Sequence, residues 1–187
     1  MVKKIKTCVF ISGNGSNLNS LIKSSKAHNF PIKIELVISN NLKSDGLKIA
    51  KKNGINSIFV IYKNRIKFEK LCLNKIKKNK IKFICLAGFM KILSFNFIKK
   101  FPNKIINIHP SILPKYKGLN THKRVLKNNE KYSGCTIHYI SSTLDSGKII
   151  LQKKILIKKN ETEKSLKAKV LRLEHKAYPE AIVSLFG

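Results

Sequence analysis

Three polar residues in the second half of the chain have types and spacing that suit acid–base chemistry. Asn107 and His109 stand two positions apart in the run Ile105–His109, and Asp145 follows in a Leu-Asp-Ser-Gly turn. Side chains alternate between the two faces of a strand, so Asn107 and His109 share a face if the run is extended. That face presents an amide donor beside an imidazole that exchanges a proton near neutral pH. Pro110 lacks a backbone N–H and favours an extended residue before it, which predicts a strand end at His109.

Each of these residues also has an ordinary structural interpretation. An aspartate before Ser-Gly is typical of a turn, and an isolated Asn-x-His is typical of a polar loop. If the turn folds against the end of the strand, the carboxylate of Asp145 can orient the ring of His109. Among the other histidines, His28 is predicted to be exposed, His138 is interpreted as structural, and His122 is predicted to lie near the site. No histidine pair has the spacing of a zinc-binding helix, so no metal site is predicted.

A glycine-rich segment, Gly13–Asn17, joins a predicted strand to a predicted helix. Its two glycines permit backbone conformations that turn N–H groups inward, and a helix N-terminus attracts phosphate. Ser16 is predicted to cap the helix. No Gly-Lys-Ser/Thr follows, and Leu18 stands where a dinucleotide fingerprint has its third glycine. The segment therefore favours a phosphate monoester over ATP or NAD, and a tight turn with a cap is the alternative.

The elements that must position these residues follow from hydrophobic periodicity. The predicted strands of the first part are Ile5–Ser12, Ile32–Ser39, Ser57–Ile61, Ile81–Leu86 and Ile105–Ile108. The predicted helices are Ser16–Lys26, Ser44–Lys52 and one whose apolar face holds Phe68, Leu71, Cys72 and Ile76. This alternation predicts an α/β fold with a doubly wound, mostly parallel sheet.

The second part of the chain has a different pattern. Cys135–Ser141 and Ile149–Ile157 are consecutive predicted strands with no helix between them, which indicates an antiparallel extension at one edge. A late helix is predicted from the apolar stripe of Leu166, Val170, Leu173 and Ala177. No repeat or linker divides the 187 residues, so residues 1–187 are predicted to form one domain.

The predicted strands bring three unusual segments to one edge of the sheet. Gly13–Asn17, Ala87–Met90 and His109–Ser111 each follow a predicted strand. Ligands of open α/β sheets bind at the carboxyl ends of the strands. Three segments that meet at this edge indicate a binding site more strongly than any one of them.

Composition limits the classes of partner. Lys and Arg number 39 against 9 acidic residues, which gives a net charge of +30. The lysines are spread along the chain and only three residues are arginine, whereas base readout favours arginine. The codon bias of an AT-rich genome explains this excess better than nucleic-acid binding does. Four dispersed cysteines without a C-x-x-C pair predict buried, reduced thiols in a cytoplasmic protein, and no apolar run approaches the ~20 residues of a membrane helix.

Taken together, five collinear segments resemble the phosphoribosylglycinamide formyltransferases, folate-dependent enzymes of purine biosynthesis. The matching segments are 11–18, 86–93, 106–116, 144–147 and 174–175, spread over nearly the whole chain. The resemblance implies formyl transfer from the cosubstrate 10-formyltetrahydrofolate to the amine of glycinamide ribonucleotide, by a monomer or homodimer. Lys91 is a departure, because the family often has arginine at this position.

The resemblance also implies roles for individual residues. Asn107, His109 and Asp145 would be catalytic, and Gly15, Ser16 and Asn17 would hold the substrate phosphate. Leu171, Arg172, Leu173 and Glu174 would contact the same substrate, although Glu174 taken alone reads as a solvated helix position. The folate site would comprise Arg65, Met90, Lys91, Ile92, Leu93, Asn107, Ser141, Ser142, Thr143, Leu144 and Asp145.

The chemistry of these residue types agrees with formyl transfer. An amine that attacks a formyl carbon creates an oxyanion, to which Asn107 and a protonated His109 can donate. Three alternatives stay open: a methionyl-tRNA formyltransferase, a formyltetrahydrofolate hydrolase, and a basic nucleic-acid-binding module without catalysis. The first two normally carry a further domain, for which the 187 residues are expected to leave no room, and retention of the three catalytic residues argues against the third.

Overall fold

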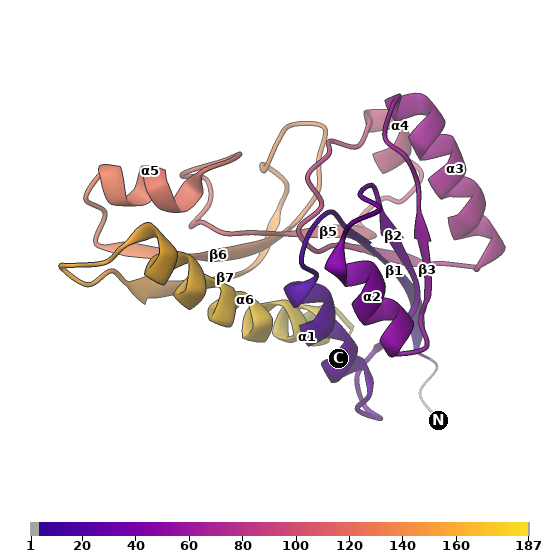
Figure 1. Cartoon of the computed structure of the whole chain (residues 1–187), viewed down its shortest axis with the longest axis horizontal. Coiled ribbons are helices and arrows are strands. Elements are labelled where there is room, and N and C mark those ends of the chain that lie inside the picture. The colour runs from indigo at the N-terminus through magenta and orange to yellow at the C-terminus, as the bar shows by residue number, and fades with distance from the viewer. Residues whose placement is uncertain (1–3, 187) are drawn as a thin grey trace.

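A seven-stranded sheet in the order β3-β2-β1-β4-β5-β6-β7 forms the centre of the computed structural model, which describes residues 4–186 (Figure 1). The strands are β1 (Ile5–Ile11), β2 (Ile32–Ser39), β3 (Asn56–Phe59), β4 (Phe83–Leu86), β5 (Ile105–His109), β6 (Tyr132–Tyr139) and β7 (Ile149–Leu156). The helices are α1 (Ser16–Ser25), α2 (Asp45–Lys52), α3 (Arg65–Lys78), α4 (Phe95–Ile98), α5 (Thr121–Lys127) and α6 (Glu163–Phe186).

The sheet is parallel from β3 through β5 and antiparallel from β5 through β7. This arrangement confirms the predicted doubly wound sheet with an antiparallel edge. In the antiparallel pairing, Asn107 of β5 lies opposite His138 of β6, and His109 lies opposite Thr136. The register therefore brings a second histidine beside the predicted catalytic strand.

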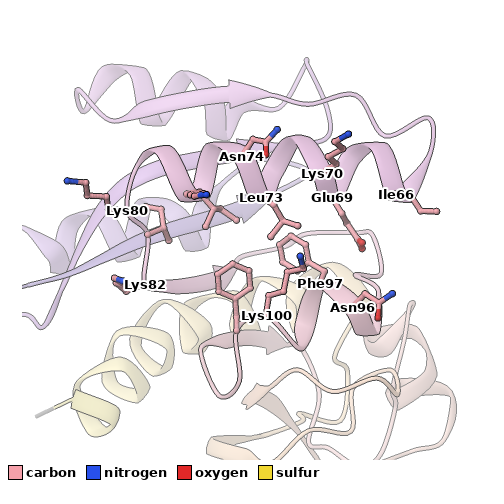
Figure 2. A pocket seen from close by; sticks show the side chains of 14 residues that line it. Ile66, Glu69, Lys70, Leu73, Asn74, Lys80, Lys82, Asn96, Phe97 and Lys100 are labelled. Atoms are coloured by element: carbon pink, nitrogen blue, oxygen red, sulfur yellow. The ribbon is translucent and has the colours of Figure 1, made fainter.

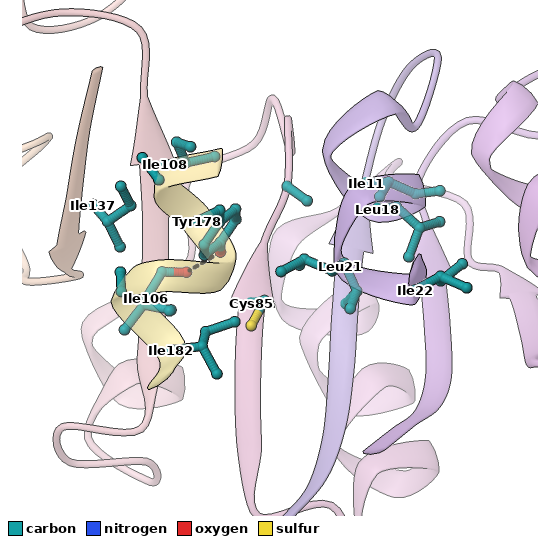
Figure 3. Packing of buried hydrophobic residues seen from close by; sticks show 14 of the residues in the cluster. Ile11, Leu18, Leu21, Ile22, Cys85, Ile106, Ile108, Ile137, Tyr178 and Ile182 are labelled. Carbon is teal, nitrogen blue, oxygen red and sulfur yellow. Dashed lines mark hydrogen bonds between the residues drawn. The ribbon is translucent and has the colours of Figure 1, made fainter. Parts of the chain in front are cut away.

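Both faces of the sheet are covered, as the alternation along β1 requires. Val9 and Ile11 point to the side where α1 and α6 pack, and Cys8 and Phe10 point to the side of α3 and α4. Figure 3 shows side chains of α1 and α6 on the first side, with Tyr178 of α6 reaching the central strands. Its hydroxyl donates to the backbone oxygens of Leu86 and Ile106, at 3.0 and 3.3 Å.

The four cysteines are buried and carry free thiols, as predicted. Burial raises the pKa of Cys72, Cys85 and Cys135 to about 12, so these thiols stay protonated. None of the helices between residues 4 and 186 combines the length and the apolar character needed to cross a lipid bilayer.

Several predicted boundaries differ from the structure. The strand expected over Ile81–Leu86 begins only at Phe83, because the N–H of Ile81 bonds to the oxygen of Ile76 and so closes the end of α3. Ser16 is the first residue of α1 and not its cap, because the cap position is taken by Gly15 in the left-handed region. The short helices α4 and α5 were not predicted, since neither is long enough to show helical periodicity.

Candidate active site

The predicted catalytic residues meet where β5 ends. Nδ1 of His109 lies 3.3 Å from Oδ2 of Asp145, and the two side chains are only 6% and 9% exposed. The same carboxylate oxygen accepts a hydrogen bond of 2.9 Å from the N–H of Gly118. Asp145 reaches this position from the connection between β6 and β7. The carboxylate therefore orients the imidazole, as the sequence predicted.

His138 is a member of the site that sequence reasoning treated as structural. Its Nδ1 lies 2.8 Å from the oxygen of Tyr139, and its Nε2 lies 3.3 Å from Nδ2 of Asn107. Burial lowers the pKa of His138, which favours the neutral ring. With the proton on Nδ1, Nε2 accepts from the amide of Asn107 and fixes that side chain's orientation. Nε2 also lies 3.8 Å from Oδ1 of Asp145, so Asp145 stands between two histidines.

The segment from Tyr116 to Gly118 contacts the other side of the His109 ring. Nε2 of His109 lies 2.9 Å from the backbone oxygen of Tyr116. Both this carbonyl and the carboxylate of Asp145 are acceptors, so the two contacts are satisfied together only when both ring nitrogens carry a proton. Tyr116 and Asp145 have φ angles of 58° and 46°, in the left-handed region that non-glycine residues rarely adopt. Such strained positions gather at functional sites.

A cavity of about 100 Å³ opens beside these residues. Among the residues predicted to bind folate, its wall includes Lys91, Ile92, Leu93, Asn107, Ser141, Ser142, Thr143, Leu144 and Asp145. Met90 and Arg65 do not line it. Arg65 is the exposed first residue of α3, and Met90 is 64% exposed. The ammonium of Lys91 lies 5.1 Å from the ring centre of Tyr62, which holds the lysine at the cavity wall by a cation–π contact.

The glycine-rich segment forms the N-terminus of α1. Gly15 has a φ of 70°, and a Cβ atom there would lie 2.5 Å from Cα of Gly46. Only glycine fits both the conformation and this close approach. The hydroxyl of Ser44 donates to the oxygen of Gly13 at 2.6 Å, which braces the segment against α2. No side chain caps α1, so its first N–H groups, including those of Ser16 and Asn17, are available to an anion.

A buried carboxylate adjoins this segment. Nδ2 of Asn17 donates to Oε2 of Glu174 at 2.7 Å, and Glu174 is 6% exposed. Burial raises the pKa of Glu174 to about 7, although the bond from Asn17 opposes this shift. The expectation of a solvated Glu174 was wrong because α6 packs against α1 and encloses the residue. Of the neighbouring predicted contacts, Arg172 is exposed, and Leu171 and Leu173 are half-buried.

The other histidines occupy different positions. His28 is exposed, as predicted. His122 lies on α5, and burial together with the charge of Lys167 lowers its pKa. The charge of His109 contributes to the same shift, and the side chain of His122 does not line the cavity of about 100 Å³. No group of three or more His, Cys, Asp or Glu side chains in the described residues is arranged to hold a metal ion.

A larger cavity of about 820 Å³ lies elsewhere, between α3 and the segment 96–101 that includes part of α4 (Figure 2). We call it the α3–α4 groove. None of the residues predicted to bind or transform a substrate lines it. The smaller cavity, with its convergent amide, imidazole and carboxylate, is therefore the candidate active site.

Comparison with known proteins gives a consistent set of relatives. The family described as "Formyl transferase" matches residues 5–182. Phosphoribosylglycinamide formyltransferase of Escherichia coli K12 is 36% identical over 182 residues, which cover 96% of this chain and 85% of that protein. The human trifunctional purine biosynthetic protein adenosine-3 is 40% identical over 183 residues. These cover 96% of this chain, which spans only 18% of that relative's length.

Solved structures agree with these sequence relatives. The crystal structure of phosphoribosylglycinamide formyltransferase from Brucella melitensis superposes with a TM-score of 0.94 at 36% identity, and covers 99% of this chain and 97% of that one. The corresponding structure from Anaplasma phagocytophilum gives a TM-score of 0.92 at 38% identity, with coverage of 98% and 88%. The predicted fold class is thereby confirmed.

Proposed function

Because the chain belongs to the formyl transferase family, and within it to the phosphoribosylglycinamide formyltransferases, we propose that it formylates glycinamide ribonucleotide in de novo purine biosynthesis. The formyl donor is 10-formyltetrahydrofolate. The contact between His109 and Asp145, beside Asn107 at the wall of the cavity, is the observation that carries this proposal. Residues 1–187 act as one catalytic domain, in the cytoplasm, as a monomer or homodimer.

In the proposed reaction, the substrate amine attacks the formyl carbon and the carbonyl oxygen becomes negatively charged. The bond between the formyl carbon and the folate nitrogen then breaks, the amine loses a proton, and the folate nitrogen gains one. Asn107 gives one N–H to His138, which leaves its second N–H for the oxyanion. A donor in this role lowers the barrier by about 3–4 kcal/mol in comparable sites.

His109 supplies the second donor in this proposal. Its Nε2–H points at the backbone oxygen of Tyr116, so the substrate must displace this carbonyl before the ring can reach the oxyanion. Asp145 stabilises the positive charge of the ring through Nδ1. It also passes the proton from the substrate amine to the folate nitrogen through water. All of these groups act without a covalent intermediate on the enzyme.

The two substrates occupy opposite sides of this centre. The phosphate of glycinamide ribonucleotide binds the N–H groups of Gly15, Ser16 and Asn17, and Glu174 with its neighbours Leu171, Arg172 and Leu173 contacts the same molecule. The folate lies in the cavity between segments 91–93 and 141–145. Arg65 and Met90, which lie outside the cavity wall, contact only the exposed end of the folate.

One spectroscopic assay tests the proposal. The purified protein is mixed with glycinamide ribonucleotide and a 10-formyl folate, and the deformylated folate is followed. We expect product only when the amine acceptor is present. Product formed equally well without the acceptor would indicate a hydrolase, and tight tRNA or duplex binding without turnover would indicate a nucleic-acid-binding module.

A further inference from the structure

The α3–α4 groove has an apolar floor and runs along one side of α3. In Figure 2, Leu73 of α3 points across the groove toward Phe97 of α4, and Ile66 lies at one end. Ile66 is 75% exposed, which is a high value for an isoleucine in contact with an apolar groove. The lining of α3 extends from Ile66 to Lys77, roughly 17 Å at the helical rise. The groove is therefore long enough for three turns of a helix.

The rim of the groove is strongly basic. The five lysines that line it are Lys70, Lys77, Lys80, Lys82 and Lys100. Within residues 4–186 none of them forms a salt bridge, which is the usual state of a lysine in this chain of 39 basic and 9 acidic residues. What sets these five apart is that they surround one apolar groove. Lys80 also has a φ of 53°, so an ammonium group stands at a helix end where glycine or asparagine is favoured.

Glu69 is the one acidic residue that lines the groove, and its charge is already engaged. Its two carboxylate oxygens accept hydrogen bonds of 2.6 Å from the N–H and the hydroxyl of Ser94. The residue is buried, with 7% of its surface exposed. An anionic ligand on the lysine rim would therefore meet no free carboxylate in the groove.

We propose that the α3–α4 groove binds an acidic amphipathic helix of a partner protein. Apolar side chains spaced at i, i+3, i+4 and i+7 would cover the exposed Ile66 and the half-buried Leu73, and flanking carboxylates would meet the lysines. A compact anion would leave most of the groove empty. A nucleic acid would leave the aliphatic floor unmatched, because single strands bind by stacking on exposed aromatic rings, whereas Phe97 is only 1% exposed and Phe101, the second ring of the groove, is half-buried.

The docking surface is separate from the candidate active site. The two cavities share no lining residue. They lie on opposite sides of α4, where Phe97 faces the groove and Ile98 faces the active-site cavity. Binding in the groove can therefore be measured without turnover, and its failure would leave the proposed formyl transfer untouched.

Fluorescence anisotropy with a labelled synthetic peptide tests this proposal. The peptide has leucines at i, i+3, i+4 and i+7 and glutamates elsewhere, over about 12 residues, enough to cover the groove. A scrambled peptide of the same composition is the control. The test variant is Lys77→Glu/Lys100→Glu, which reverses one charge on each wall. The matched variant is Lys154→Glu/Lys176→Glu, which makes the same change in net charge at exposed lysines of β7 and α6.

We expect the amphipathic peptide to bind the parent protein more tightly than the scrambled peptide. Lys77→Glu/Lys100→Glu should weaken binding about tenfold, and the matched variant should stay within about twofold of the parent. Both variants should keep the parent's formyl-transfer rate, which shows that they fold. Equal weakening by the two variants, equal binding of the scrambled peptide, or displacement of the peptide by an oligonucleotide of equal charge would overturn the proposal.

Discussion

The two ends of the candidate active site each hold a buried carboxylate, but in different surroundings. Asp145 contacts the ring of His109 and the N–H of Gly118. Glu174 accepts a hydrogen bond from the neutral amide of Asn17, and burial raises its pKa to about 7. Burial disfavours the charged form of a carboxylate, and a neutral amide offsets this less than a cation does. The surroundings therefore make Glu174, at the proposed phosphate end, a pH-sensitive group, whereas Asp145, at the proposed catalytic end, contacts a ring that it can orient.

Removal of the ring at the catalytic end should have the largest effect. We expect His109→Ala to lower kcat by about 10²–10⁴-fold, because the variant loses both the donor and the group that Asp145 orients. Asp145→Ala should act in the same direction. Steady-state kinetics would measure kcat, and circular dichroism would show that the fold persists. A near-normal kcat in either purified variant would contradict the assignment.

Loss of the Asn107 amide should have the second-largest effect on kcat. Asn107→Ala is expected to lower kcat by about 10²–10³-fold with little change in KM for the ribonucleotide, because its free N–H acts on the oxyanion only in the transition state. His138→Phe removes the acceptor that orients this amide while the apolar volume is kept. Its loss of kcat should be smaller than that of Asn107→Ala. A larger loss would give His138 a direct part in the reaction.

Sequence alone predicts the features of both ends that depend on local conformation. The period-two pattern of β5, with proline after His109, was sufficient to place Asn107 and His109 on one face at a strand end. The glycine spacing likewise placed a helix start beside Gly15, which is proposed to bind the substrate phosphate. In each case the prediction depends on local conformation, which the residues themselves determine. The doubly wound, mostly parallel sheet then followed from general rules for α/β sheets.

Features that depend on long-range packing were not predictable in this way. His138 enters the site because of the antiparallel register between β5 and β6, which no local pattern specifies. Glu174 is buried because α6 lies against α1, two helices far apart in sequence. The backbone oxygen of Tyr116 reaches His109 through a left-handed turn at a residue that rarely adopts one. Backbone acceptors leave no signal in residue types.

A change at the phosphate end should alter how stability depends on pH. The native pKa of Glu174, about 7, lies above its ordinary value of 4.5, so the folded protein holds an extra proton between these values. The contribution of Glu174 to the free energy of unfolding should therefore fall as pH rises from 5 to 8, by up to about 3 kcal/mol. The lowered pKa values of His122 and His138 act in the opposite direction. Relative to the parent, Glu174→Gln should remove this decline. Denaturant titrations at several pH values would measure it.

Glu180→Gln is the matched control for this measurement. Glu180 lies on the same helix, is half exposed and pairs with Lys153 at 2.7 Å. Its replacement should keep the parent's decline with pH. If Glu174→Gln also keeps it, Glu174 does not cause the decline, and burial does not make it pH-sensitive.

The smallest expected effects concern the basic residues predicted to bind folate. Lys91 lines the cavity, whereas Arg65 stands outside it at the exposed start of α3. Lys91→Ala should raise KM for the 10-formyl folate about fivefold, because an exposed ion pair contributes at most about 1 kcal/mol. Arg65→Ala should stay within about twofold, because Arg65 lies outside the cavity wall. Lys91→Arg should lower KM for the 10-formyl folate, since a guanidinium can donate two hydrogen bonds to one carboxylate. A larger rise for Arg65→Ala than for Lys91→Ala would mean that the main charged contact to the folate lies at the start of α3 and not at the cavity wall.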